Sequence, residues 1–429
     1  MDARQPRWRP WVITGLLFFF MFINFADKVV IGLAAVPMMQ EMQLSPIQWG
    51  MVGSSFFYFF SIACVLVGFL VNRVPAKWAL AVMALIWALT QFPMLGAVSL
   101  GVLIASRVVL GAGEGPAYPV ALHAAYKWFP NHRRTLPTAI ISIGAGIGVT
   151  ISAPILVYVI YAYSWHAAFG LLGVVGLVWV AAWLLLGEEG TIAEPVVASG
   201  DADEDRVPYL QLLTCRTALG VFIAGFAVNW GLALLVAWVP PFMQQGLGYS
   251  VEATKWLVTL TWLATATVAP IVAWLSQRWV ARGASSRLAR GVPAALFPMS
   301  AGIITMIAVP LHPGPLQIAL FVVANSIGGL IYTLGPPIMA EITPVRQRGG
   351  ILGLTTAIHS TAGLIAPALT GYIIAAGPTL HDGYVHAFML MGGIVAAGGF
   401  IALLLIRPEA DIARFAARSW APARRAAAE

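Results

Sequence analysis

Long apolar stretches alternate with short polar connections along the whole chain. Each stretch holds about twenty residues or more, the length that an α-helix needs to cross the hydrocarbon core of a bilayer. Their continuity excludes a strand-based barrel, in which apolar and polar residues would alternate. The pattern therefore predicts twelve transmembrane helices, at approximately residues 11–36, 48–71, 78–98, 100–126, 136–162, 166–187, 215–243, 253–279, 290–310, 316–340, 350–376 and 384–406.

Composition agrees with this pattern, since 60% of the 429 residues are hydrophobic and only 10% are charged. A soluble fold could not hide so much apolar surface, so an all-α multi-pass membrane protein is predicted. The net charge of +7 does not indicate nucleic-acid binding, because nearly all Lys and Arg residues fall in the N-terminal segment, alternate loops and the C-terminal tail. Lys255 alone represents the opposite side, so the positive-inside rule places both termini in the cytoplasm.

The longest polar connection, residues 188–210, is rich in Asp and Glu and has no apolar periodicity. It predicts a flexible cytoplasmic linker between two six-helix bundles, residues 1–187 and 211–406, followed by a basic cytoplasmic tail at 407–429. A weak internal repeat supports two related halves. A Pro-x3-Arg motif follows the fourth and the tenth predicted helix, and an Ala-Pro pair recurs in the fifth and the eleventh. Such repeats are typical of secondary transporters.

Four charged residues lie inside the predicted spans. Arg107 and Glu114 are two helical turns apart, so they project from one face of the fourth helix, about 10 Å from each other along its axis. Asp27 and Lys28 lie in the first helix. Each charge costs about 2.5–3.5 kcal/mol or more at the bilayer centre, so such groups face a bundle interior and mark ion or substrate pathways. We expect the fold to bring these four side chains together.

Asp27 and Glu114 are the predicted proton carriers, because a carboxyl group in a poorly solvated cavity can bind and release a proton near neutral pH. Arg107 stays charged, so it is the predicted switch: it pairs with a carboxylate when that group is ionised, and it is freed or engages the substrate when that group is protonated. Lys28 is the predicted anchor for a substrate anion. The alternative is a static ion pair of Asp27 with Lys28 or Arg107 that only fixes helix packing.

Several motifs resemble the major facilitator superfamily. Its signature loop reads Gly-x3-Asp-Arg-x-Gly-Arg/Lys, and this chain has Gly68-x3-Asn72-Arg73-Val74-Pro75, with Asn and Pro replacing Asp and Gly. The chain resembles the anion:cation symporter family more closely. That family has an Asp-Arg pair in the first span and, in the fourth, Arg, Glu seven residues on, and two prolines. The matching residues are Asp27-Lys28, Arg107, Glu114, Pro116 and Tyr118-Pro119, followed by Trp128-Phe129-Pro130, Arg133-Arg134 and Ser164-Trp165-His166.

The resemblance implies proton-coupled symport of a small organic carboxylate by alternating access. Polar and aromatic residues near the centres of the spans are the other candidate substrate contacts: Tyr58, Asn229, Trp230, Asn325, Tyr332 and His359. His359 is equally suited to relay a proton or to pack as a hydrogen-bonded histidine. The second half offers many aromatic residues and few hydroxyl ligands. That composition favours an aromatic or short-chain acid over a sugar acid.

The sequence has no phosphate-binding loop, zinc-ligand cluster or nucleophile motif, so an enzyme, a metal site and a cofactor other than the coupling proton are not expected. An uncoupled facilitator or anion exchanger with the same substrates is the alternative, and a transporter-like sensor is a second one. Gly144, Gly146 and Gly148 predict close helix packing at the fifth span. We expect a monomer in the bacterial cytoplasmic (inner) membrane.

Overall fold

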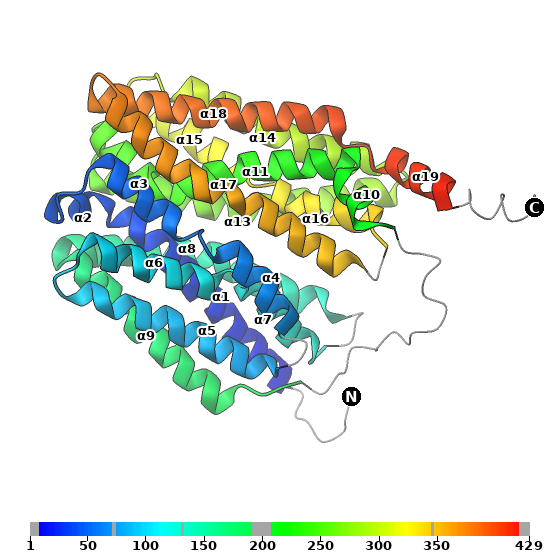
Figure 1. Cartoon of the computed structure of the whole chain (residues 1–429), viewed down its shortest axis with the longest axis horizontal. Helices are drawn as coiled ribbons and strands as arrows, with labels where there is room; N and C mark the ends of the chain where they lie inside the picture. The colour runs from blue at the N-terminus through cyan, green and yellow to red at the C-terminus, as the bar shows by residue number, and fades with distance from the viewer. Residues whose placement is uncertain (1–7, 71–73, 130–132, 191–206, 345–346, 420–429) are drawn as a thin grey trace, which may run out of the picture. The chain divides into compact units, whose positions relative to one another are not determined.

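The computed structural model describes residues 8–70, 74–129, 133–190, 207–344 and 347–419. Within these ranges every regular element is helical, and twelve helices are long and apolar enough to cross a membrane (Figure 1). The predicted all-α architecture with twelve spans is therefore confirmed. The side of the membrane on which each end lies, and the division into two six-helix bundles, stay predictions.

The helices of the first six spans and their connections are α1 (Arg9–Leu33), α2 (Ala35–Glu41), α3 (Pro46–Ser55), α4 (Phe60–Leu70), α5 (Ala76–Gln91), η1 (Phe92–Leu95), α6 (Leu100–Glu114), α7 (Ala117–Tyr126), α8 (Thr135–Ala162) and α9 (Trp165–Leu186). Those of the remaining chain are α10 (Tyr209–Thr214), α11 (Arg216–Ala237), α12 (Val239–Pro241), η3 (Phe242–Gly246), α13 (Val251–Ala281), η4 (Arg287–Gly291), α14 (Val292–Ala308), α15 (Pro315–Gly328), α16 (Ile331–Ile342), α17 (Arg348–Ala376), α18 (Leu380–Leu405) and α19 (Pro408–Ser419).

Serine residues are the N-caps of three helices in the spans. Ser45 accepts a hydrogen bond from the Gln48 amide, and the Gln48 side chain accepts one from the Ser45 amide, which completes a capping box before α3. Ser99 and Ser164 cap α6 and α9 in the same way with a single bond each. These bonds satisfy amide groups that have no partner within the first turn of a helix.

Three spans are broken near their middle. The second is non-helical at residues 56–59, the fourth at Gly115-Pro116 and the tenth at Gly329-Leu330. Pro116 thus falls at a break, as its lack of an amide hydrogen predicts. Five other prolines lie inside helical segments of the spans: Pro119, Pro154, Pro336, Pro337 and Pro367.

The chain forms two compact units. Each unit is made of stretches that lie close together in space but are separated along the sequence. Unit 1 comprises Met1–Val196, Ala233–Ala266 and Gly363–Ala387, and unit 2 comprises Val197–Leu232, Thr267–Ala362 and Phe388–Glu429.

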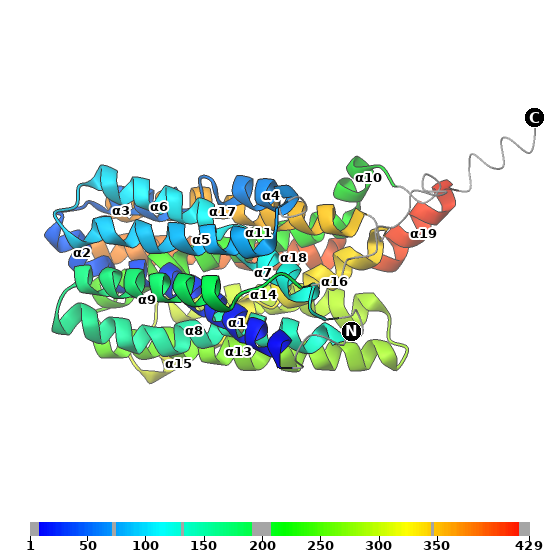
Figure 2. The same ribbon diagram turned by 90° about the horizontal axis from the view of Figure 1, so that it is seen from below.

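Unit 1 is organised around α1, which packs along α8 (Figure 2). A Cβ atom at Gly144 would lie 2.5 Å from the carbonyl oxygen of Phe18, and one at Gly148 would lie 2.6 Å from that of Phe22. The predicted close packing at the fifth span is therefore confirmed. The other face of α1 buries Phe20 against Trp87 and Trp179, with ring centroids 4.4 and 4.9 Å apart.

Unit 1 also joins ends of the second, seventh and eleventh spans. Gly50 and Gly53 of α3 lie against Pro367, where a Cβ atom would meet its carbonyl oxygen at 2.5 Å and its Cβ at 2.8 Å. Indole groups complete the contact. Trp49 donates to the carbonyl of Ala237 at 3.0 Å, and Trp238 donates to that of Pro367 at 3.1 Å. Small residues and buried indole hydrogen bonds thus replace the hydrophobic driving force that lipid cannot supply.

Unit 2 has its own apolar core, formed by α11, α14, α16 and α17. Its fully buried members include Val221, Ala294, Ile331 and Ile351. The helix α19, which opens the predicted basic tail, is anchored to this unit by Asp411, whose carboxylate accepts a hydrogen bond of 2.9 Å from the Thr217 amide near the start of α11. Residues 420–429 of that tail lie outside the described residues.

The first residues of the predicted linker are anchored in unit 1. Glu188 forms an ion pair with Arg9, and Glu189 pairs with Lys127. Glu189 also accepts hydrogen bonds from the amides of Ala76 and Lys77, at 3.2 and 3.1 Å, so it caps the start of α5. Linker residues 191–206, the Asn72-Arg73 part of the signature loop and Pro130 lie outside the described residues. The last two residues of the predicted linker, Tyr209 and Leu210, begin α10.

Candidate transport site

Lys28 is the centre of a charged cluster in unit 1. Its Nζ lies 3.1 Å from Oε2 of Glu114, whose side chain has no exposed surface. It also donates a hydrogen bond of 2.5 Å to Oδ1 of Asn24. The rings of Phe25 and Phe60 cover the ammonium group, with centroids 4.5 and 5.9 Å from Nζ. One cation is thus held by a carboxylate, an amide and two aromatic faces.

Local helix geometry explains the arrangement on α1. Asn24 and Lys28 are four residues apart, so they share one face of the helix, which runs unbroken through this region. Asp27 points about 100° away from Lys28. It is only 1% exposed, and among the described residues its Oδ1 has no hydrogen-bond partner.

Arg107 does not form an ion pair within 4 Å with any described carboxylate. It is 3% exposed, and its guanidinium lies over the ring of Phe56, 4.8 Å from the centroid. Glu114 is instead paired with Lys28, a pairing that the sequence did not predict. The expected pairing of Arg107 with Glu114 or Asp27 is therefore not found among the ion pairs of the described residues.

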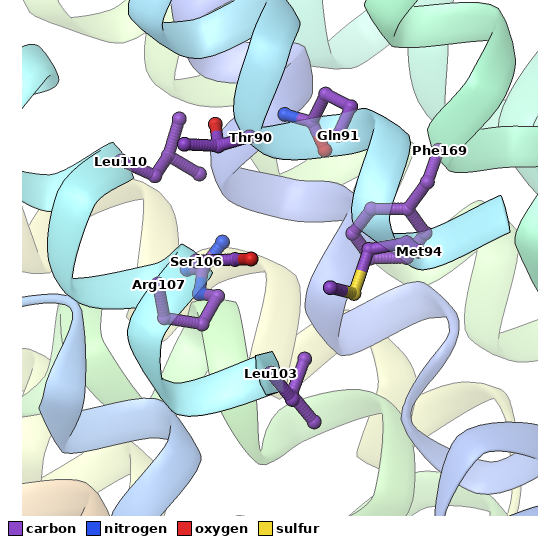
Figure 3. A pocket seen from close by; sticks show the side chains of 8 residues that line it. All are labelled: Thr90, Gln91, Met94, Leu103, Ser106, Arg107, Leu110 and Phe169. Carbon is purple, nitrogen blue, oxygen red and sulfur yellow. The ribbon is translucent and has the colours of Figure 1, made fainter. Parts of the chain in front are cut away.

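A small cavity adjoins Arg107 (Figure 3). It has room for about one water molecule. Residues of α6 line one side, and Thr90 and Gln91 of α5 line the other. Nε2 of Gln91 and Nε of Arg107 are buried without a hydrogen-bond partner within the described part of the chain. A bound water molecule would satisfy such donors.

Two glycines bring the fourth span against the break in the second. A Cβ atom at Gly111 would overlap the carbonyl oxygen of Phe56, and one at Gly115 would overlap that of Phe60. The spacing of four residues puts both glycines on one face of this span. Close backbone approach therefore fixes this part of the fourth span, and Glu114, between the two glycines in sequence, pairs with Lys28.

A second polar cluster lies in unit 2. Asn229 of α11 donates a hydrogen bond of 2.9 Å to the Tyr332 hydroxyl of α16. The Tyr332 ring meets His359 of α17 edge to face, with centroids 5.9 Å apart. Nε2 of His359 lies 3.2 Å from the carbonyl oxygen of Val221, and Gly225 leaves the space that its ring fills. Three of the predicted substrate contacts thus come together from three spans.

The other three predicted contacts do not join this cluster. Trp230 is buried against Phe226, with ring centroids 6.2 Å apart. Asn325 donates to the carbonyl of Phe321 in its own helix. Tyr58 belongs to unit 1, where it lies in the break of the second span and is 45% exposed.

Sequence reasoning did not single out Asn24, Phe25 and Phe60. Asn24 was recognisable as a buried amide one helical turn from Lys28. The two aromatic residues carried no such signal, because apolar rings are common throughout the spans and only the packing shows which of them cover a cation.

Twelve candidate spans, two of them broken beside charged residues of the cluster, are typical of a secondary transporter. The family model of the Major Facilitator Superfamily matches residues 17–309 and 221–427, so the chain belongs to this superfamily. The resemblance inferred from the motifs is thereby confirmed. Its members transport solutes, so the chain is not an enzyme.

The sequence identity to individual relatives is low, at 17–27% for three of them. The hexuronate transporter of Bacillus subtilis is 26% identical over 416 residues, covering 92% of this chain and 94% of its own. A probable sulfoacetate transporter of Cupriavidus necator is 27% identical over 421 residues, which cover 92% of this chain and 94% of that transporter. A bacterial homologue of the human lysosomal transporter Spinster has a TM-score of 0.75 at 17% identity, covering 94% of this chain and 98% of its own, and it supports the fold alone.

Proposed function

We propose that this protein is a proton-coupled symporter of a small organic carboxylate in the bacterial inner membrane. The observation that carries the proposal is the buried Lys28–Glu114 pair, with 3.1 Å between the ammonium nitrogen and the carboxylate oxygen. The names of the two curated relatives, a hexuronate and a sulfoacetate transporter, support an organic anion as the substrate. The substrate preference inferred from sequence, an aromatic or short-chain acid, stays a prediction.

In this proposal, proton binding is coupled to anion binding because Glu114 and the substrate carboxylate compete for Lys28. Lys28 has one carboxylate partner within 4 Å among the described residues, and that partner is Glu114. A substrate carboxylate can take this place only when Glu114 gives it up, and Glu114 gives it up when it binds a proton. The proton on Glu114 and the anion on Lys28 therefore bind together, and they leave together on the other side of the membrane.

Asp27 is the second proton carrier in this proposal. It is buried on the same helix as Lys28, and its charge adds to the negative potential near the ammonium group. Protonation of Asp27 removes a repulsion that an incoming anion would otherwise meet. Arg107 supplies a permanent positive charge to the cluster, because a guanidinium keeps its proton.

Transport in proteoliposomes tests this mechanism. The full chain would be reconstituted with an alkaline interior, and uptake of a panel of radiolabelled carboxylates would be followed for the wild type, Glu114→Gln and Asp27→Asn. We expect the wild type to accumulate at least one acid, and both variants to lose accumulation while they still exchange labelled for unlabelled acid. Glu252→Gln is the matched control, since this carboxylate is 65% exposed.

Two results would count against the proposal. Uptake that ignores the pH gradient, together with its loss in Lys28→Ala, would leave the anion site and remove proton coupling, as for a facilitator or an exchanger. Binding of a carboxylate without any flux in either direction would indicate a sensor.

A further inference from the structure

Asn24 has an unused hydrogen-bond donor beside Lys28. Its side chain is fully buried, and its oxygen Oδ1 accepts a hydrogen bond of 2.5 Å from Nζ of Lys28. An ammonium group only donates hydrogen bonds, so the oxygen of the amide faces it and the nitrogen is left for another partner. That nitrogen, Nδ2, is buried and has no hydrogen-bond partner among the residues that the structure describes.

The unused donor lies close to the ammonium group. Nδ2 and Oδ1 of Asn24 are bonded to the same carbon atom, which places Nδ2 within about 5 Å of Nζ of Lys28. A hydrogen bond from nitrogen to oxygen spans about 2.9 Å, so one carboxylate group is able to reach both nitrogens. Lys28 and Asn24 therefore present two donors to a single anion.

Glu114 uses only one of these donors. Its carboxylate oxygen lies 3.1 Å from Nζ of Lys28, but it accepts no hydrogen bond from Nδ2 of Asn24. The rings of Phe25 and Phe60 cover the ammonium group and carry no charge of their own. The resident carboxylate thus makes a one-point contact, and Nδ2 is a contact that an incoming anion gains and Glu114 lacks.

A second donor gives the anion site a geometry that Lys28 alone does not supply. A lysine ammonium is a point charge, whereas a guanidinium holds a carboxylate in a bidentate fork. We propose that Lys28 and Asn24 together form a two-point site for the substrate carboxylate, in which Nζ binds one oxygen and Nδ2 binds the other. The inference rests on the proposed function for the substrate being a carboxylate, and it adds Asn24 as a substrate-binding residue.

A double-mutant cycle between the two residues tests the inference. The variants of the full chain are Asn24→Leu, Lys28→Arg and their combination. Binding of propionate, phenylacetate and gluconate in detergent would be measured from the shift in melting temperature at several acid concentrations, because a ligand that binds the folded state stabilises it. This readout needs neither flux nor a pH gradient.

We expect Asn24→Leu to weaken acid binding about tenfold, the effect of one hydrogen bond to a charged group. Lys28→Arg should bind the acids about as tightly as the wild type, because a guanidinium carries both donors of a fork. In the Lys28→Arg background, Asn24→Leu should then have little effect. Gln277→Leu is the control for the loss of an amide group, because Gln277 is exposed on α13, and it should leave the affinity unchanged.

Two results of the cycle would overturn the two-point site. One is an unchanged affinity in Asn24→Leu. The other is the same loss in both backgrounds, because Asn24 would then act only through helix packing or through the position of Lys28.

Asn24→Asp replaces the cycle if Lys28→Arg does not fold. It keeps an acceptor for Lys28 and removes the Nδ2 donor, so we expect weaker acid binding, and wild-type affinity in this variant would overturn the site. These outcomes leave carboxylate transport intact. A wild type that neither binds nor takes up any carboxylate would instead refute the proposed function, and the two-point site with it.

Discussion

Replacing Lys28 by Met is the perturbation whose outcome follows most directly from the structure. Met keeps the length and apolar stem of Lys28 and removes only the charge. Glu114 then loses the cation at 3.1 Å while its side chain stays fully buried. Breaking a buried ion pair by removing one partner costs about 3–5 kcal/mol, because the other charge remains without compensation.

The two single variants should not be equivalent. The Lys28 side chain is 17% exposed and keeps Asn24 and the Phe25 ring as partners, whereas that of Glu114 has no exposed surface. Glu114→Gln is therefore expected to cost less than Lys28→Met. The double variant Lys28→Met/Glu114→Gln should recover most of the loss, which gives a coupling energy of about 2–3 kcal/mol.

Thermal unfolding in detergent, followed by the fluorescence of the 16 Trp residues, measures these effects. A loss of about 3 kcal/mol corresponds to roughly 5–10 °C in melting temperature. Lys255→Met, which breaks an ion pair with the largely exposed Glu252, is the control. Additive effects of the two single variants, or a Lys28→Met deficit no larger than that of the control, would refute a strong buried pair.

Three further predictions concern the scaffold. Gly111→Ala should lower stability by about 1–3 kcal/mol in the same melting assay, because its Cβ would overlap the Phe56 carbonyl. Gly15→Ala is the control and should not lower stability, because the space around Gly15 is open. Equal effects of the two substitutions would refute the close approach. Glu189→Gln should cost about 1–2 kcal/mol by weakening the cap on α5, and an unchanged melting temperature would contradict this role. The hydrogen bond from His166 lowers the pKa of Glu41 from its usual 4.5, so its stabilisation is present above about pH 4.5 and lost as the pH falls through the folded pKa. Glu41→Gln should therefore melt below wild type at pH 7, and the difference should shrink as the pH falls through the folded pKa of Glu41; a constant difference would argue against this linkage.

Local sequence features were sufficient to predict the fold class, the twelve spans and the superfamily. Apolar runs of bilayer length can form only helices in lipid, because every backbone amide must be satisfied within its own segment. The cost of burying Asp27, Lys28, Arg107 and Glu114 in a bilayer was enough to identify them as candidate functional residues.

The choice of partners depended on tertiary packing. Helical periodicity shows which residues share a face, but not which residue of another helix lies opposite. The pairing of Glu114 with Lys28 instead of Arg107 depends on how closely α6 approaches the break in the second span, and the glycine contacts with the Phe56 and Phe60 carbonyls set that approach. The capping of α5 by Glu189, 113 residues away from Ala76 in the chain, depends likewise on packing. Such long-range contacts leave no periodic pattern in the sequence.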